Sequence, residues 1–151
     1  MGETIAGPFT FETGPEGWTT FTTAAATAWR QGPPGASSSQ SFQVAPYENE
    51  SLYLLTSPQM EHPGGRALVT FNRRQNTEDC CDFLAVEWSS DGALWNGIGA
   101  WDAVNPSYPV FDEESIEFAA PAGALFVRFR LTSDQLVNGE GAYVDDVLIE
   151  R

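Results

Sequence analysis

The chain has 151 residues, of which 42% are hydrophobic and 13% aromatic, so it is long enough for one domain that buries roughly 68–70% of its unfolded surface. Its 21 acidic residues outweigh seven basic ones, all of them arginine, and the formal net charge is −14. This charge repels nucleic acid and anionic membranes, which excludes both as partners. No apolar run approaches the ~20 residues that a membrane-inserted helix needs.

The first residues, MGETIAGPFTF, lack the charged-then-apolar pattern of a secretory signal. If the protein is exported, we therefore expect its signal to lie outside this sequence. The segment PFTFETG is typical of a strand with Phe9 and Phe11 on one side. The alanine-rich TTAAATAW contains too much threonine, and lies too close to a Pro-Gly flank, for a helix. Residues 31–41, QGPPGASSSQS, have the composition of a surface loop.

Downstream, the dominant hydrophobic period is two, which indicates half-buried antiparallel strands. The segments with this pattern are SLYLLTS (51–57), RALVTFNR (66–73), DFLAVEWSS (82–90), ESIEFAA (114–120), ALFVRFRLTS (124–133) and AYVDDVLIE (142–150). Segments rich in Gly, Pro, Asn and Ser separate them, as turns do. We therefore predict a single all-β domain over 1–151, a two-sheet antiparallel jelly-roll sandwich with little or no helix.

Groups suited to catalysis are scarce. His62 is the only histidine, and its place in the turn-like MEHPGG favours a surface-loop residue without a role. Cys80 and Cys81 are neighbours with Cα atoms ~3.8 Å apart, below the usual 4.4–6.8 Å of a disulfide. Two thiols, or one thiol bonded to another chain, are favoured over a vicinal disulfide. We therefore expect that the protein is not an enzyme.

The last strand raises a question of charge, because Asp145 and Asp146 lie in the middle of the apolar YVDDVLI. Asp145 shares the strand parity of Val147 and Ile149, which predicts that it points toward the core, whereas Asp146 faces water. An unpaired ionised carboxylate in the core is very costly. Arginine, backbone N–H groups or a metal ion must therefore compensate Asp145.

Aromatic side chains offer a way to bind sugar, since an exposed indole can stack on a ring. Trp29, Trp95 and Trp101 lie near predicted turns and are the candidate ligand-binding residues; the alternative is that each covers an edge of the sandwich. Arg128 and Arg130 lie on a strand face opposite the core. They could hold an acidic partner, but the excess of carboxylates favours neutralisation within the chain.

Three segments together resemble one family of β-jelly rolls: FTFETGPEGWTTF (9–21), DFLAVEWSSDGALW (82–95) and VRFRLTSDQLVNGEGAYVDDVLIE (127–150). The family includes the accessory domains of immune-inhibitor-A-type secreted bacterial metallopeptidases and is similar to MAM domains of cell-surface receptors. The motifs occur in the family's order over nearly the whole chain. MAM domains usually carry several spaced cysteines, so the adjacent pair here favours the bacterial accessory branch.

The resemblance implies that the first and last strands lie side by side, and that a structural cation binds near this seam, as in many relatives. Calcium is the ion expected there, because it takes oxygen ligands from separate segments. The candidate ligands carried over by position are Glu12, Asp145 and one of Glu48, Asn49 or Glu50, with Asp82 and Asp146 weaker candidates. The alternative is that Asp145 only accepts hydrogen bonds from loop backbone.

These observations favour a non-catalytic extracellular module, secreted or at the cell surface, that binds a carbohydrate or a protein surface and carries structural calcium. The alternative is a structural or assembly domain, such as an adhesin, coat or filament subunit, that acts through self-association. The sequence leaves the oligomeric state open.

Overall fold

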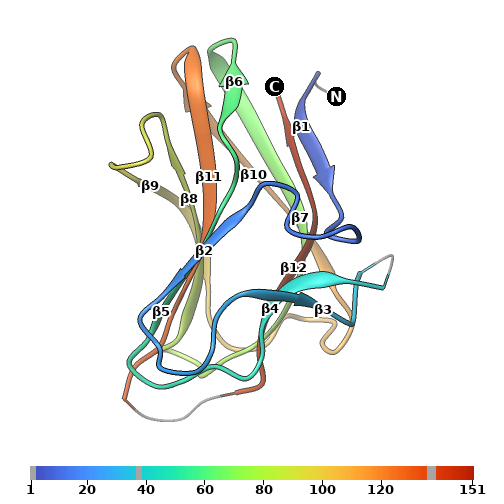
Figure 1. Cartoon of the computed structure of the whole chain (residues 1–151), viewed down its shortest axis with the longest axis vertical. Helices are drawn as coiled ribbons and strands as arrows, with labels where there is room; N and C mark the ends of the chain where they lie inside the picture. The colour runs from blue at the N-terminus through green and yellow to red at the C-terminus, as the bar shows by residue number, and fades with distance from the viewer. Residues whose placement is uncertain (1–2, 37–38, 136–138) are drawn as a thin grey trace.

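The computed structural model describes residues 3–36, 39–135 and 139–151. Within these residues the strands form two antiparallel sheets that pack face to face (Figure 1), and no helix is present. The prediction of an all-β two-sheet jelly-roll sandwich is confirmed. No helix in this part of the chain could span a membrane.

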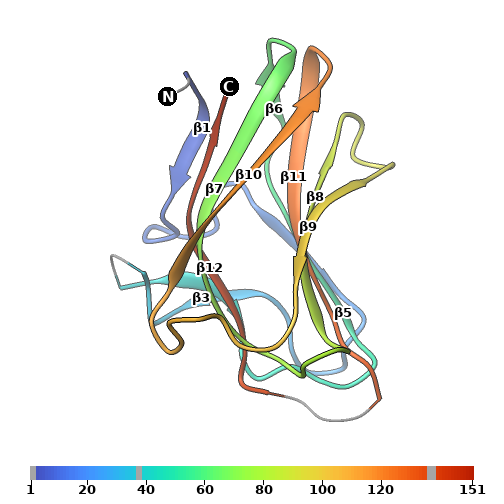
Figure 2. The same cartoon turned by 180° about the vertical axis from the view of Figure 1, so that it is seen from behind.

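One sheet, here called the β12 sheet, has the order β10-β7-β12-β4-β3, and β1 pairs with the far end of β12. Its strands are β1 (Thr4–Phe9), β3 (Arg30–Gly32), β4 (Ser41–Val44), β7 (Gly65–Asn76), β10 (Asp112–Ala120) and β12 (Gly141–Glu150). The pairing of β1 with β12 is antiparallel, so the two ends of the chain lie side by side in Figures 1 and 2. This is the seam that the resemblance implied.

The other sheet, here called the β11 sheet, has the order β2-β5-β11-β8-β9, and β6 pairs with the start of β11. Its strands are β2 (Thr19–Thr22), β5 (Leu52–Thr56), β6 (Met60–His62), β8 (Phe83–Ser89), β9 (Asn96–Trp101) and β11 (Gly123–Thr132). His62 is therefore a buried strand residue, 3% exposed, and not the surface-loop residue expected. Its Nε2 lies 3.1 Å from the carbonyl oxygen of Gly65.

The core lies between the sheets because alternate residues of the central strands point inward. On β11 these are Leu125, Val127, Phe129 and Leu131, and on β7 they are Ala67, Val69 and Phe71, all 0% exposed. The inner face of β7 continues past Phe71 with polar side chains. Arg73 and Gln75 are buried there and bond to each other, Nη1 to Oε1 at 2.8 Å.

The segment expected as a surface loop, 31–41, is partly strand. Gln31 and Gly32 belong to β3 and Ser41 to β4, because these residues pair with each other across the two strands. Between them, the described part of the connection folds back over β4. Gln43 Nε2 donates to Pro33 O at 2.8 Å, and Ser41 Oγ donates to Pro34 O at 2.7 Å.

Candidate functional site

A bulge in β12 determines where the paired aspartates lie. Asp145 is opposite Asn72 on β7, but Leu148 is opposite Thr70, so β12 has one extra residue in this interval. Asp146 occupies the extra position with a left-handed φ of 52°. Asp145 therefore lies on the outer face with Asn72, and the expectation that it shares the core side of Val147 is wrong.

Asp145 is nevertheless fully buried, because the connection between β3 and β4 covers it. Its Oδ2 accepts a hydrogen bond from Ala36 N at 2.8 Å, and its Oδ1 accepts one from Asp146 N at 2.8 Å. Two backbone N–H groups thus compensate the carboxylate in part. Asp146 is only half-buried, and its Oδ2 accepts a hydrogen bond from Asn72 Nδ2 at 3.0 Å.

Glu12 lies close to the same place. Its carboxylate accepts hydrogen bonds from Ser39 Oγ at 3.1 Å and from Gln40 N at 2.7 Å. Burial is the largest cause that raises the pKa of Asp145 to about 7; the charges of Asp146 and Glu12 also raise it, whereas the backbone bonds from Ala36 and Asp146 lower it. Three carboxylates thus act on one place beside the seam, which is the charge arrangement that a divalent cation would neutralise.

The third predicted segment, residues 48–50, is held by other loops. Glu48 Oε2 accepts hydrogen bonds from Thr27 Oγ1 at 2.5 Å and Ala26 N at 3.1 Å, and these bonds lower its pKa. Asn49 O accepts a bond from Ser51 Oγ at 2.8 Å, and Glu50 N donates to Asp134 O at 2.7 Å. Asp145 and Glu12 therefore both contact the connection between β3 and β4, whereas Glu48 contacts the segment that precedes β3.

Asp82, a weaker candidate, is buried on the turn between β7 and β8. Its Oδ2 accepts a hydrogen bond from Tyr47 OH at 2.6 Å and its Oδ1 accepts one from Asp134 N at 3.0 Å. These bonds connect three loops at one end of the sandwich, so this carboxylate has an evident structural role.

Two of the three predicted tryptophan platforms face inward. Trp29 is 3% exposed and packs in the core, so the expectation that it is an exposed ligand-binding residue is wrong. Trp101 is half-buried opposite Leu84, with its ring against Phe71 and the Arg73 guanidinium 4.9 Å from the ring centroid. It lines a shallow pocket of about 490 Å³, but both neighbours limit stacking by a ligand.

Trp95, in the turn between β8 and β9, lies over the outer face of the β11 sheet. The guanidinium carbon of Arg128 is 4.1 Å from its ring centroid. Arg128 Nε also donates to Glu87 Oε1 at 2.6 Å, and Arg130 Nη1 is 3.7 Å from Glu87 Oε2. Glu87 and Arg128 are opposite each other on β8 and β11, so both arginines neutralise a carboxylate, as the sequence favoured.

The same face extends to the edge strand β2. Phe21 is opposite Leu54, which is opposite Arg130, so the three form one row across β2, β5 and β11. Phe21 is 56% exposed. We call the set Phe21, Leu54, Glu87, Trp95, Arg128 and Arg130 the outer sheet face. Sequence reasoning did not single out Phe21 or Glu87, although the alternation of β8 already placed Glu87 opposite the core residues Leu84 and Val86.

Comparison with known proteins finds one similar protein by sequence and many solved structures with a similar fold. No family model matches the chain. It is 29% identical over 149 residues to Bacillopeptidase F of Bacillus subtilis (strain 168), covering 92% of this chain but only 10% of that protein. A likeness to one segment of a bacterial peptidase agrees in part with the resemblance found in the sequence, whereas the likeness to MAM domains stays a prediction.

Two of the similar solved structures illustrate the shared fold over nearly the whole chain. The K3 cleaved adhesin domain of Lys-gingipain from Porphyromonas gingivalis W83 has a TM-score of 0.71 at 21% identity, over 99% of this chain and 98% of that one. TmCBM61, solved in complex with β-1,4-galactotriose, has a TM-score of 0.69 at 14% identity, over 99% of both chains. At these identities the likeness establishes a shared β-sandwich fold.

Proposed function

We propose that this chain is a non-catalytic extracellular module, secreted or held at the cell surface, that binds carbohydrate on the outer sheet face. The observation that carries the proposal is the arrangement of Trp95, Arg128 and Glu87 on the outer face of the β11 sheet, where the half-buried Trp95 has one ring face against Arg128 and a sugar would pack on the other. An indole beside hydrogen-bonding charged groups offers a sugar both a ring to pack on and partners for its hydroxyls. Burial of the only histidine, His62, supports a non-catalytic role.

The comparisons support this proposal without identifying the ligand. One structure of the same fold holds a galactose trisaccharide and another is an adhesin domain. The chain spans about a tenth of the length of Bacillopeptidase F, which supports a module within a larger protein. β-1,4-Galactan is therefore the first polysaccharide to test.

Trp95→Ala and Leu94→Ala form a matched pair for this test. Leu94 is the adjacent residue of the same turn and is 77% exposed, so its removal perturbs the turn without touching the proposed platform. Gel retardation by β-1,4-galactan and by a panel of other soluble polysaccharides should be lost in Trp95→Ala and kept in Leu94→Ala. If no polysaccharide retards the parent chain, or if Trp95→Ala is retarded equally, the carbohydrate proposal fails.

We also propose that calcium binds at the seam between Glu12 and Asp145. The support is the burial of Asp145, the repulsion from Asp146 and Glu12, and the loop that touches both candidate ligands through Ala36 and Gln40. A bound cation would turn this repulsion into attraction and tie β12 to the segment that follows β1. Its role would be to stabilise the fold, and the two backbone N–H groups on Asp145 remain the competing explanation.

Self-association is a second candidate function because β2 is an exposed edge strand. Its residues Thr19, Thr20 and Phe21 are all exposed, and unpaired strand edges are templates for pairing with a second chain. Light scattering on the parent chain and on Phe21→Lys tests it. If the parent chain is a dimer or polymer and Phe21→Lys is a monomer, the result favours assembly as the function. If the parent chain is a monomer at every concentration, self-association is excluded as the function.

A further inference from the structure

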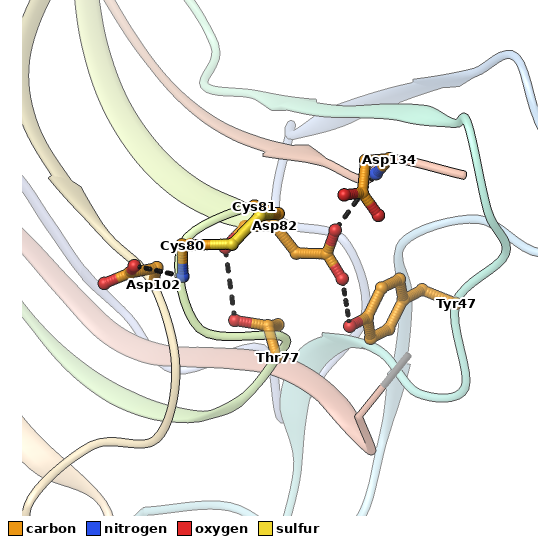
Figure 3. Close-up of a disulfide and its surroundings, with 7 residues drawn as sticks. All are labelled: Tyr47, Thr77, Cys80, Cys81, Asp82, Asp102 and Asp134. Carbon is orange, nitrogen blue, oxygen red and sulfur yellow. Dashed lines mark hydrogen bonds between the residues drawn. A yellow bond between two sulfur atoms is a disulfide. The ribbon is translucent and has the colours of Figure 1, made fainter. Parts of the chain in front are cut away.

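The turn between β7 and β8 holds the two cysteines, and they are bonded to each other (Figure 3). The two alternatives favoured from the sequence, free thiols or a bond to another chain, are therefore wrong. The Cα atoms of the bonded pair are 3.8 Å apart, and Cys80 has a left-handed φ of 82°. Its N–H donates to Asp102 Oδ2 at 2.7 Å, so the bonded pair is fixed to the connection that follows β9.

The sulfur of Cys81 lies within a group of atoms that could bind a metal ion. The Sγ of Cys81 and one carboxylate oxygen each from Glu78 and Asp134 all lie within 4.8 Å of one another, and all three residues are half-buried. Glu78 and Cys81 come from the β7–β8 turn, whereas Asp134 follows β11. Asp82 holds the two segments together by accepting the hydrogen bond from Asp134 N.

The spacing suits one shared ion. Two ligands of a tetrahedral zinc ion at roughly 2.0–2.3 Å lie ~3.3–3.8 Å apart, so the side chains must rotate to bring these atoms about 1 Å closer before they share one metal. In the disulfide, however, the Cys81 sulfur carries no thiolate charge and is a poor ligand. Two half-buried carboxylates are then the only charged donors of the group.

We propose that reduction of Cys80–Cys81 creates a binding site for a borderline or soft divalent cation, such as zinc, with Cys81, Glu78 and Asp134 as ligands and Cys80 beside them as a fourth donor. Thiolates select this class of ion, whereas calcium and magnesium prefer sites made of oxygen alone. The site is thus chemically distinct from the proposed calcium site at the seam. It does not depend on carbohydrate binding.

The chemical step balances with a dithiol as the reductant. One dithiol sulfur attacks the disulfide, the second closes the dithiol's own ring, and two electrons and two protons pass to Cys80 and Cys81. The metal then displaces the thiol protons to solvent. Reoxidation by an external disulfide reverses the step and releases the ion, so the turn would bind metal only under thiol-reducing conditions.

Cadmium titration of the full chain tests the proposal, because cadmium–thiolate bonds absorb in the ultraviolet. One sample is kept oxidised; the other is treated with dithiothreitol and freed of it by gel filtration under argon. We expect a saturable thiolate absorption with one equivalent in the reduced sample only, with its circular dichroism matching that of the oxidised protein. The double variant Cys80→Ser/Cys81→Ser should lack the absorption.

Glu78→Gln and Asp79→Asn separate a real ligand set from general negative charge. Asp79 is the exposed neighbour of Glu78 and is not in the group of ligand atoms. Loss of the Glu78 carboxylate should weaken cadmium binding to the reduced protein about tenfold or more, and loss of the Asp79 carboxylate should leave it unchanged.

Four results would overturn the proposal: equal cadmium affinity in the oxidised protein, a folded reduced protein without the thiolate absorption, equal effects of the two substitutions, or loss of the folded circular dichroism spectrum on reduction. None of them depends on whether the outer sheet face binds sugar.

Discussion

Asp145 and Asn72 face each other across β12 and β7, and one extra residue directly after this pair puts Asp145 on the opposite side of the sheet from Val147. Asp145 is buried there by the connection between β3 and β4 and not by the hydrophobic core. Its neighbours are therefore backbone N–H groups and other carboxylates, and both its protonation and its proposed metal follow from that position.

The unfolding free energy of the metal-free protein should fall as pH rises from 5 to 7. Asp145 has a folded pKa of about 7 and an ordinary value of 3.8. Between these values only the native state holds its proton, so raising the pH costs stability, by up to about 1.4 kcal/mol per pH unit. The loss is complete about one pH unit above the folded pKa, and well below pH 3.8 both states are protonated and the contribution is constant.

Urea unfolding in EDTA at several pH values measures this slope. Glu48, Asp91, Asp112 and Glu140 have lowered pKa values, so their stabilising contributions are lost only as pH falls through the acid range. Asp145→Asn loses one hydrogen-bond acceptor, so it should be less stable than the parent chain at low pH. Its unfolding free energy should change little between pH 5 and 7. An equal slope in both proteins would contradict the raised pKa.

Calcium should stabilise the protein more at pH 8 than at pH 5, since the ion competes with the proton on Asp145. At ~100 times its dissociation constant, a ligand of the native state adds roughly 2.7 kcal/mol, which raises the melting temperature of a domain of this size by several degrees. Calorimetry with EDTA and then with added calcium measures this rise in melting temperature.

The variant Asp145→Ala should abolish the rise. Glu61→Ala, which removes an exposed glutamate of β6, should keep it. No rise in the parent chain would leave Asp145 to its two N–H donors.

The long strands could be predicted from the sequence because their alternation is continuous. β7, β8, β10 and β11 each bury one face against the other sheet, and this one-sided burial appears in the sequence as a hydrophobic period of two. β12 was also predicted as a strand, although its bulge at Asp146 interrupts the alternation. β3 and β6 have three residues each. Such strands are defined by the partner they pair with and not by a pattern of their own, so they were missed.

The site could be predicted only in part. The association of Glu12 with Asp145 followed from the family resemblance, but the parity argument for Asp145 failed because one extra residue in a strand reverses the faces that follow it. Trp29 lies outside any alternating segment, so its burial left no periodic signal. The Cys80–Cys81 bond closes within a turn in which Cys80 has a left-handed φ, and composition does not reveal such a local conformation.

Removal of the Glu87 carboxylate should destabilise the protein by about 1–2 kcal/mol, because it would leave Arg128 without its partner. The Arg128 side chain is 17% exposed and the Glu87 side chain 12% exposed, and Arg128 Nε lies 2.6 Å from Glu87 Oε1. Glu117→Ala is the matched control, since its bridge to Arg66 joins side chains 61% and 48% exposed and is worth about 0–1 kcal/mol. Chemical denaturation of Glu87→Ala and Glu117→Ala compares them, and equal losses would show that the Glu87 pair contributes no more than a surface ion pair.

Gly7→Ala should destabilise the seam far more than Gly65→Ala. Both glycines have a left-handed φ, +90° and +95°, so an alanine at either position carries the same backbone penalty of roughly 1–2 kcal/mol. They differ in space: a Cβ at Gly65 meets nothing within 4 Å, whereas a Cβ at Gly7 would collide with the carbonyl oxygen of Val147 on β12. The excess loss in Gly7→Ala, measured by urea denaturation, therefore reports how tightly β1 is held against β12. If the two variants lose the same free energy, β1 can move away from β12 at little cost, and a calcium ion at this seam would have to order the first strand as well as neutralise Asp145.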